Sequence, residues 1–432
     1  MYDLKEVSGK VRAALSEQGV VQFSYKIYES EKKELNTEGG EFSLFRTTFD
    51  NGLTVNTLID GRKGTASGHD LTAAGIETAV TDAASGAESA MPDAANAIAE
   101  KQSAEVFRHG PYEADMEKFY ERLTELLETV ERDYPLIRIM MLVADHTKTH
   151  TIYENSNGTE FESFDGVYGV TLEFAGNDGE RTTGINFTGF YTRDLSRPLI
   201  ELAGMRKMLE DTEKSLELTA IEGKFVGTVI FTPGCLANFV YMLAENYLSG
   251  NVIMEGTSRW KDSIGEQVAS DKVSISLRVS DPRLASVQHF TDDGYKAEDV
   301  TVLEQGVLRS HLLSLYASLK TGRPVTKNDG SGIVMESGDV SLADMIAGVE
   351  RGLIVGGFSG GEPGANGEFS GVAKNSFYIE NGRIAGAVSE TMINGNLEAV
   401  FKTVRAISRE VICDGDSVFP YMASDGIVIS GK

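Results

Sequence analysis

The stretch GKFVGTVIFTPG, residues 223–234, marks the change of pattern that decides the fold of this chain. Its β-branched and aromatic residues are typical of a strand, and the following Thr-Pro-Gly is typical of a turn. From here on, strands and Gly-rich loops dominate, apart from a helix near residues 235–249 and a last helix at 396–410. We therefore expect two domains, residues 1–222 and residues 223–432.

The first half of the sequence alternates strands and helices. Residues 22–35 and 44–67 show the period-two pattern of strands, and we expect Asn-Gly and Asp-Gly turns to join them. Helices are predicted after Asp70 and after Asp115, each of which can cap one, and a further run of strands covers residues 137–176. Because no strict βαβ rhythm appears, the sequence predicts an α+β fold: a mixed α/β N-terminal half and a strand-rich C-terminal half.

The charge of the 432-residue chain argues against nucleic acid as a partner. Forty Lys and Arg residues against 65 Asp and Glu residues give a net charge of −25, which repels a phosphate backbone. No membrane partner is expected either, because the first residues are charged and LIRIMMLVA is too short to span a bilayer. We expect a cytoplasmic protein in which Cys235 and Cys413 are buried thiols, since no Cys cluster indicates a disulfide or zinc site.

Two histidines four residues apart, His146 and His150, are candidate metal ligands only if they lie on a helix. Their flanks IMMLVA and TIYENS are strand-like, and four residues along a strand span about 13 Å. One zinc ion needs both nitrogens at about 2.1 Å. We therefore interpret them as ordinary strand histidines.

Other candidate sites are weak. The Gly-rich residues 356–371 lack the Lys and hydroxyl of a phosphate loop and precede a strand, so they are either a long surface loop or a binding segment. No GxSxG motif supports serine catalysis. Acids such as Asp414 and Asp416 are expected by chance in so acidic a chain, on a solvated face or in a turn.

The helix near residues 235–249 carries an apolar stripe. Leu236, Phe239, Val240 and Leu243 are spaced as a helix that packs on a core requires. This spacing accounts for the helix but not for the loop after it, EGTSRW, which holds the only tryptophan of the chain.

Several longer stretches carry a family resemblance. They include residues 255–270, 289–295 and 306–326, and above all NGEFSGVAKNSFYIENGRIAGAVSETMINGNL at 366–397. With these stretches the chain resembles the TldD/PmbA family, historically called modulators of DNA gyrase. Weaker marks at residues 61–72 extend the resemblance into the first half.

The resemblance implies a metallopeptidase relationship. TldD-type members carry HExxxH on a helix just before the segment that resembles EGTS here, and this motif supplies two zinc ligands and a base. Counting back from Gly256, the three positions are Tyr241, Met242 and Asn246. A phenol, a thioether and a carboxamide cannot replace them, so we expect no catalytic residue, no metal and no cofactor in this chain.

The function implied by the resemblance is a noncatalytic, TldE/PmbA-like subunit of a TldD/TldE-type peptidase complex that acts on unfolded peptides. Its partner would be a TldD-like catalytic chain in a heterodimer, or a second copy in a homodimer. The candidate contacts with peptide or partner are Gly256, Ser258, Trp260, Phe358 and Phe369.

Two alternatives stay open at this point. One is an autonomous hydrolase that uses an unrecognised site, such as His289, Asp292 and Asp293. The other is a protein that binds a regulator.

Overall fold

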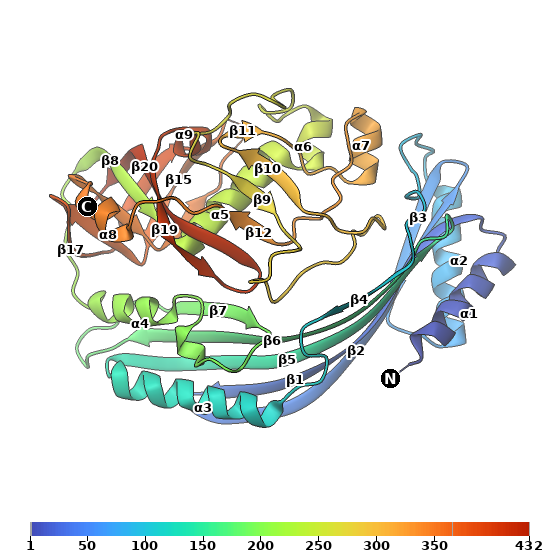
Figure 1. Ribbon diagram of the computed structural model, residues 1–432, viewed down its shortest axis with the longest axis horizontal. Coiled ribbons are helices and arrows are strands. Elements are labelled where there is room, and N and C mark those ends of the chain that lie inside the picture. The colour runs from blue at the N-terminus through green and yellow to red at the C-terminus, as the bar shows by residue number, and fades with distance from the viewer. Residues whose placement is uncertain (1, 365, 432) are drawn as a thin grey trace.

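The computed structural model describes residues 2–364 and 366–431. It contains two sheets, each built from one half of the chain (Figure 1). The elements of the first half are α1 (Leu4–Glu17), β1 (Gln22–Glu38), β2 (Glu41–Ile59), β3 (Arg62–Gly68), α2 (Ala73–Ser89), β4 (Glu105–His109), α3 (Met116–Asp133), β5 (Ile137–Asn155), β6 (Glu160–Gly176), β7 (Asn186–Thr192), the 3-10 turn η1 (Leu199–Glu201) and α4 (Met205–Lys214).

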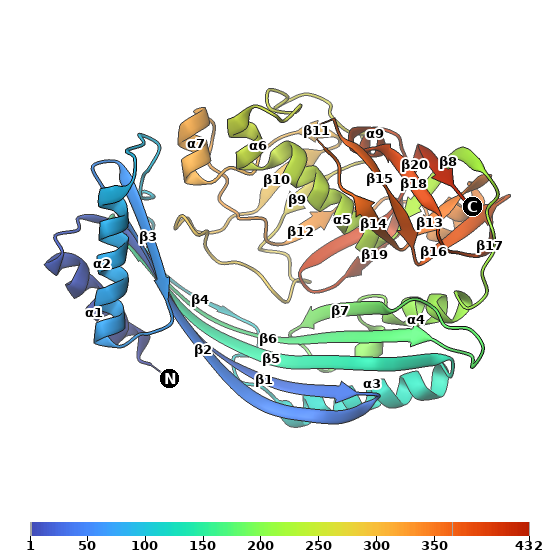
Figure 2. The same cartoon turned by 180° about the vertical axis from the view of Figure 1, so that it is seen from behind.

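The first sheet is long and curved, in the order β3-β2-β1-β5-β6-β4 with β7 beside β6. Its strands pair antiparallel except β4, which runs parallel to β6. Helices α1 and α2 pack at one end and α3 and α4 at the other (Figures 1 and 2). Each end buries its own apolar core, because a 19-residue strand such as β5 is too long for one layer of helix to cover.

The second half forms the larger sheet around one long core. Its elements are β8 (Lys224–Phe231), α5 (Pro233–Leu243), the π-helical turn η2 (Ala244–Leu248), α6 (Gly250–Glu255), β9 (Ile275–Leu277), β10 (Val300–Glu304), β11 (Val307–Leu308), α7 (Leu315–Thr321), β12 (Ile333–Met335), α8 (Leu342–Ala347), β13 (Arg351–Val355), β14 (Gly357–Gly361), β15 (Glu368–Lys374), β16 (Ser376–Glu380), β17 (Arg383–Val388), β18 (Met392–Asn396), α9 (Leu397–Lys402), β19 (Val404–Cys413) and β20 (Ser417–Ser430).

Helix α5 packs on this sheet and is the centre of the C-terminal core. Leu236, Phe239 and Leu243 of the predicted apolar stripe are buried there with Val240. Most strand pairs of this sheet are antiparallel, and among its named strands in the described residues β8–β13 and β12–β20 are the parallel pairs. The α+β class predicted from the sequence is confirmed.

The strand prediction at residues 44–67 was wrong in one place. Asn51 and Gly52 form no turn, because β2 runs straight through them and pairs with β1 along its whole length. Gly52 is needed where the ring of Tyr28 crosses the strand, since a Cβ at this position would lie against that ring. The Asp60–Gly61 turn does join β2 to β3, and both residues have positive φ, as a tight hairpin turn requires.

Three other boundaries differ from the sequence prediction. Helix α2 is capped by Thr72, while Asp70 accepts a hydrogen bond from the Thr72 N–H. The last helix ends at Lys402, and the remainder of the predicted helix is strand β19, because pairing with β20 buries its apolar residues equally well. Residues 356–371 are not a long loop but hold the β14–β15 hairpin, apart from residue 365, which lies outside the described residues.

In the described parts of the chain, no helix is long and apolar enough to cross a membrane.

Candidate functional site

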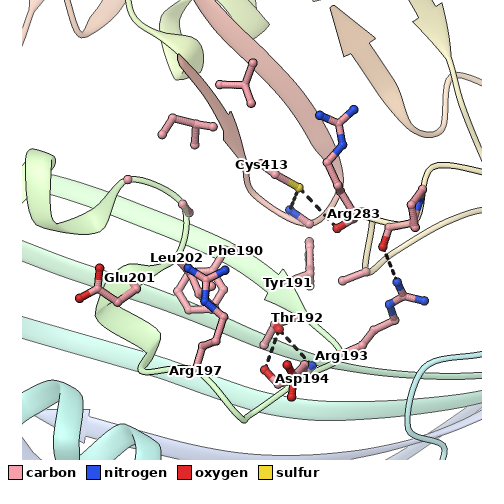
Figure 3. A pocket seen from close by; sticks show the side chains of 17 residues that line it. Phe190, Tyr191, Thr192, Arg193, Asp194, Arg197, Glu201, Leu202, Arg283 and Cys413 are labelled. Carbon is pink, nitrogen blue, oxygen red and sulfur yellow. Dashed lines mark hydrogen bonds between the residues drawn. The ribbon is translucent and has the colours of Figure 1, made fainter. Parts of the chain in front are cut away.

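A cleft lies between the first sheet and the second, and it consists of two adjoining cavities. The larger, of about 720 Å³, lies between β7 with the loop that follows it and the tip of the β19–β20 hairpin (Figure 3). The smaller, of about 280 Å³, lies between β7, α4 and the start of α5. Both are lined by Ala203, Gly204 and Ile412, so we treat them as one inter-sheet cleft.

The tip of the β19–β20 hairpin is held against both walls of the cleft. The Tyr191 N–H of β7 donates to the Asp414 carbonyl at 2.7 Å, and the Ala285 N–H donates to the Gly415 carbonyl at 2.6 Å. Gly415 has φ of 89°, and a Cβ there would overlap the Tyr191 carbonyl oxygen. Only glycine fits this close approach, so the tip is a built part of the cleft and not a free turn.

The side chains of the tip are constrained as well. The Asp414 carboxylate accepts hydrogen bonds from the Ser417 N–H at 2.7 Å and the Asp416 N–H at 2.9 Å. The Cys413 thiol contacts the Arg283 carbonyl at 3.5 Å, and burial raises its pKa. Burial, and then the charge of Asp414, raises the pKa of the Asp416 carboxyl. Asp414 and Asp416 therefore lie at a turn, one of the two places that the sequence suggested, whereas Cys413 is only partly buried and is not the buried thiol that was predicted.

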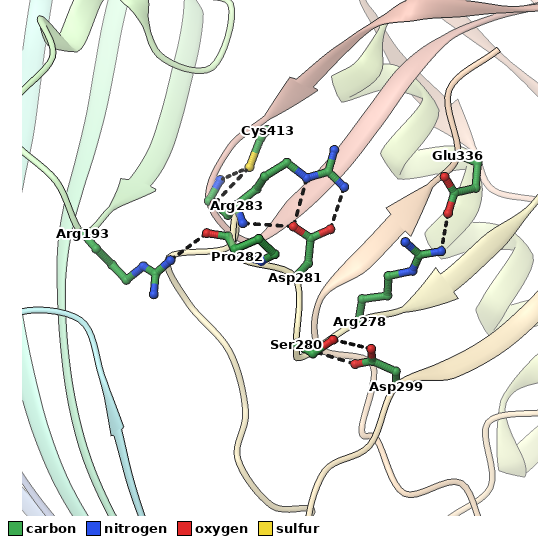
Figure 4. A network of polar contacts seen from close by, with 10 residues as sticks. Arg193, Arg278, Ser280, Asp281, Pro282, Arg283, Asp299, Glu336 and Cys413 are labelled. Carbon is green, nitrogen blue, oxygen red and sulfur yellow. Dashed lines mark hydrogen bonds and ion pairs between the residues drawn. The ribbon is translucent and has the colours of Figure 1, made fainter.

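The opposite wall is fixed by a short polar network (Figure 4). Arg283 forms two hydrogen bonds with Asp281, Nε to Oδ1 at 2.9 Å and Nη2 to Oδ2 at 2.6 Å. Between these residues, the Pro282 carbonyl accepts a hydrogen bond from Arg193 Nη2, which comes from the first half of the chain, at 2.7 Å. The network therefore joins the two walls across the cleft.

We expect the Asp281–Arg283 pair to give a pH-dependent share of stability. Its hydrogen bonds hold the pKa of Asp281 below its usual range, so the stabilisation is complete above about pH 4 and is lost as the pH falls through the lowered folded pKa. Asp281→Asn should cost roughly 1–2 kcal/mol at pH 7, less than for a fully buried pair because Arg283 is partly exposed.

Urea unfolding of both proteins at about pH 7, 5 and 3 measures this effect. The difference between them should be constant from pH 7 to 5 and should shrink below pH 4. A difference that grows as the pH falls would contradict the assigned role of the carboxylate.

Helix α5 presents one side to the cleft. Thr232 caps it, with its hydroxyl accepting from the Cys235 N–H, and Pro233 occupies the first turn. Pro233, Gly234 and Ala237 line the smaller cavity. Tyr241 follows Ala237 by one helical turn and is 45% exposed. Burial of the rest of the ring, and then the charges of Asp416 and Asp414, raises the pKa of Tyr241.

The other two positions of the expected metal motif do not join Tyr241 in a ligand set. Met242 is buried in the C-terminal core. Asn246 uses its Nδ2 to donate to the Met242 carbonyl at 2.9 Å. The three side chains do not fit a zinc ion, because none is an imidazole, thiolate or carboxylate.

The helix backbone directly after Tyr241 and Met242 has an unusual form, and this part includes Asn246. From Ala244 to Leu248 it is π-helical, and the Ser249 N–H donates to the Ala244 carbonyl five residues back at 2.8 Å. Five residues on an α-helix turn through about 500°, which puts the first and last on different sides. A π turn has more residues per turn, so it reduces the angle about the helix axis between two side chains five residues apart. Such turns are frequent at functional sites.

The EGTSRW loop after this helix is exposed apart from two buried side chains, Ser258 and Trp260. The Ser258 hydroxyl donates to the Tyr247 carbonyl at 2.7 Å, and Trp260 stacks on the Tyr247 ring. Trp260 is 2% exposed and donates through Nε1 to Glu398 at 3.1 Å. Of the three candidate contacts in this loop, only Gly256 is exposed.

The two candidate phenylalanines of the β14–β15 hairpin belong to the core that α5 covers. The ring of Phe369 is 3% exposed and lies 5.2 Å from Phe239 of α5. Phe358 is partly buried, and its ring lies 5.4 Å from Phe239 and 5.6 Å from Phe369. The three rings pack edge to face, so the β14–β15 hairpin packs against the buried side of α5.

The residues of the alternative hydrolase site do not converge. His289 Nε2 lies 2.7 Å from Asp165 of β6. Asp292 forms an ion pair with Lys26 at 2.7 Å, and Asp293 accepts from the Leu315 N–H. His289 and Asp292 therefore contact the first half of the chain, the Asp293 carboxylate contacts the second half, and the three side chains have separate partners.

The histidine pair lies on strand β5, as predicted. His146 Nε2 contacts the Pro111 carbonyl at 2.7 Å, and burial lowers its pKa. His150 Nε2 lies 3.0 Å from Glu162 and the ring stacks on Phe164. Within residues 2–364 and 366–431, no three His, Cys, Asp or Glu side chains are grouped so that they could hold a metal ion.

The sequence analysis missed the residues that form the cleft. Tyr191, Ala285 and Gly415 contribute mainly backbone groups, for which side-chain motifs give no signal. Gly415 between two aspartates was the one visible indication, because such a glycine is typical of a tight turn.

Comparison with known proteins agrees with this architecture. Residues 223–431 match the family model described as PmbA/TldA metallopeptidase C-terminal domain. A metalloprotease PmbA homolog of Haemophilus influenzae is 24% identical over 84% of this chain and 82% of its own length.

Solved structures share the fold over nearly the whole chain. TldE from Thermococcus kodakarensis is similar with a TM-score of 0.84 at 20% identity, covering 98% of this chain and 99% of that one. A putative modulator of DNA gyrase from Bacteroides thetaiotaomicron has a TM-score of 0.85 at 21% identity, with full coverage of both. With the matched C-terminal residues and the stretches at 255–270 and 366–397, these findings show that the chain belongs to the TldD/PmbA family.

Proposed function

We propose that this chain is the noncatalytic, TldE/PmbA-like subunit of a metallopeptidase complex that acts on unfolded peptides. The observation that carries the proposal is the state of α5. Tyr241 on α5 and Asn246 in the π turn that follows it stand where the family resemblance puts the zinc ligands, and neither side chain fits a zinc ion. A helix in this place without metal ligands is the expected form of a subunit whose partner performs the chemistry.

The inter-sheet cleft is the proposed path of the peptide. One wall is strand β7, which among the described strands pairs only with β6, and apolar side chains such as Ile354 and Phe377 line the smaller cavity. Backbone hydrogen bonds with shallow apolar contacts bind extended chains with little sequence preference. Tyr241 and the exposed Gly256 are the candidate contacts that the fold leaves accessible.

The experiment is digestion of an unfolded peptide by this chain, by a TldD-type chain, and by their mixture, each with and without chelator. No cleavage is expected from this chain alone, and chelator-sensitive cleavage is expected from the mixture. Elemental analysis of this chain after mild chelation should find no stoichiometric zinc.

Cleavage by this chain alone that survives the chelator would favour an autonomous hydrolase. A TldD-type chain whose full activity does not depend on this chain would contradict the subunit role. The heterodimer is the expected assembly during activity, and the residues of α5 give no basis for activity in a homodimer.

A further inference from the structure

The larger cavity of the inter-sheet cleft carries positive charge on a chain whose net charge is −25. Its lining includes three arginines, Arg193, Arg197 and Arg283, and two carboxylates, Asp194 and Glu201 (Figure 3). The lining therefore holds one more positive charge than negative. An excess of positive charge in a concave wall attracts an anion, because the low-dielectric walls concentrate the field.

Three of these charged groups already have partners within the protein. Arg283 is paired with an aspartate through two hydrogen bonds. Glu201 Oε1 accepts from Arg206 Nε at 2.7 Å. The Asp194 carboxylate accepts hydrogen bonds from the N–H and from the hydroxyl of Ser196. Each group would have to give up contacts in order to bind a ligand.

The other two arginines have no carboxylate partner. Among the described residues, neither Arg193 nor Arg197 forms an ion pair, and the Arg197 guanidinium forms no hydrogen bond. Arg193 donates one hydrogen bond, from Nη2 to the Pro282 carbonyl at 2.7 Å (Figure 4). The charge of Arg197 is one of the smaller causes that lower the pKa of Asp194, after the hydrogen bonds from Ser196. Both guanidinium groups therefore keep N–H donors for a ligand.

The loop that carries both arginines, residues 193–198, is held in place at two points. Arg122 of α3 donates to its carbonyls, Nε to Leu195 at 2.8 Å and Nη2 to Ser196 at 2.6 Å. The hydrogen bond of Arg193 fixes the start of the loop to the opposite wall. A fixed backbone presents the two guanidinium groups, so less conformational entropy is lost when a ligand binds.

A carboxylate is the anion that this lining fits best. A guanidinium can donate two parallel N–H bonds to the two oxygens of one carboxylate, and such bonds are about twice as strong as neutral ones. The single excess positive charge matches the single charge of a carboxylate. A phosphate group would bring nearly two charges close to Asp194 and Glu201.

We propose that the larger cavity binds one carboxylate group of the peptide between Arg193 and Arg197. The inference rests on the proposed function, because it names the peptide group that this part of the cleft selects. The group is either an Asp or Glu side chain or the C-terminal carboxylate of the peptide. The smaller cavity adjoins the larger and offers apolar side chains, so an apolar residue of the same peptide can lie beside the carboxylate. The cleft thus adds one electrostatic preference to binding that otherwise tolerates many sequences.

The first test measures the binding of labelled, unstructured peptides to the full chain by fluorescence anisotropy. Four versions share one Leu-containing sequence and carry Glu or Gln at one position and a free or amidated C-terminus. The version with both carboxylates should bind about 10-fold more tightly, or better, than the version with neither. Loss of the bound carboxylate alone should have the same effect as loss of both, so the four versions identify its source.

The overall charge of the chain makes this order diagnostic. A net charge of −25 repels a more acidic peptide, so general electrostatics predicts that the neutral version binds better. A preference for the acidic version requires a local positive site. Added salt should reduce that preference, because it screens the attraction.

The second test replaces the arginine that has no other contact. Arg197→Gln should weaken binding of the acidic peptide by about 10-fold or more and leave the neutral peptide unchanged. Arg197→Lys keeps the charge but not the two parallel donors, so it should restore part of the preference. Arg383→Gln is the matched control, since Arg383 lies on β17 and is not among the residues that line either cavity. It should bind both peptides as the unchanged chain does.

Three results would overturn the inference: equal binding of the acidic and neutral peptides, a preference that survives Arg197→Gln, or no binding of any version. The first two would leave the proposed function standing, because digestion with the TldD-type chain tests it separately. The third would also remove the cleft as the path of the peptide. Circular dichroism identifies a variant that fails to fold before its binding is judged.

Discussion

Replacing Phe369 by alanine is expected to lower the free energy of unfolding by about 3–5 kcal/mol. The ring is 3% exposed and packs edge to face on Phe239 and Phe358. Its removal leaves a cavity below α5 that the neighbouring strands cannot fill without moving. The effect should appear as a lower urea midpoint and a lower thermal midpoint.

Phe187→Ala is the matched control for Phe369→Ala. Phe187 is 74% exposed on β7, and exposed substitutions usually change stability by no more than about 0.5 kcal/mol. The contrary result would be a Phe369→Ala protein with an unchanged midpoint and a weakened association with the TldD-type chain. That result would show that the ring contacts a partner and is not held in the core.

The second large effect is expected at Gly415. Gly415→Ala should cost about 2–5 kcal/mol, because it combines a positive φ that L-residues avoid with overlap between the new Cβ and the Tyr191 carbonyl oxygen. Relief of this overlap requires the hairpin tip to leave β7. The inter-sheet cleft should then open, and limited proteolysis should cut near residues 413–417.

A substitution at Gly426 distinguishes the cost of the positive φ from the cost of the overlap with the Tyr191 carbonyl. Gly426 also has a positive φ, 84°, but a Cβ there would meet nothing within 4 Å. Gly426→Ala should therefore cost only about 1–2 kcal/mol and leave the tip resistant to protease. Equal losses from the two substitutions, with equal resistance, would mean that the contact with Tyr191 does not hold the tip.

The local pattern of the sequence was sufficient for most elements. The apolar stripe of α5, the helix after Asp115 and the strand character of His146 and His150 follow from periodicity and capping, which act over a few residues. The absence of imidazoles at Tyr241 and Asn246 is also a property of the sequence alone. No fold can turn a phenol and a carboxamide into the ligand pair of a zinc peptidase.

Tertiary contacts decided the cases where local signals were ambiguous. Asn51–Gly52 has the composition of a turn, but pairing with β1 over the full length of β2 outweighs it. Residues 404–410 carry helical spacing, yet the edge of β20 offers them a ladder of hydrogen bonds that a helix end does not. In both cases the partner residues lie across a hairpin, Tyr28 opposite Gly52 and Ser424 opposite Val404, so a window of a few residues does not contain them.

For function, too, the sequence determined the features that lie within single segments, and the tertiary structure decided the features that need several segments together. The family motifs and the missing metal ligands lie within single segments and were readable from residues 241–260 and 366–397. The inter-sheet cleft with its arginine-lined cavity, and the burial of Trp260 and Phe369, depend on segments that meet only in the fold. Burial and pairing are properties of the whole chain, because they depend on which distant residues exclude water from a given side chain or backbone group.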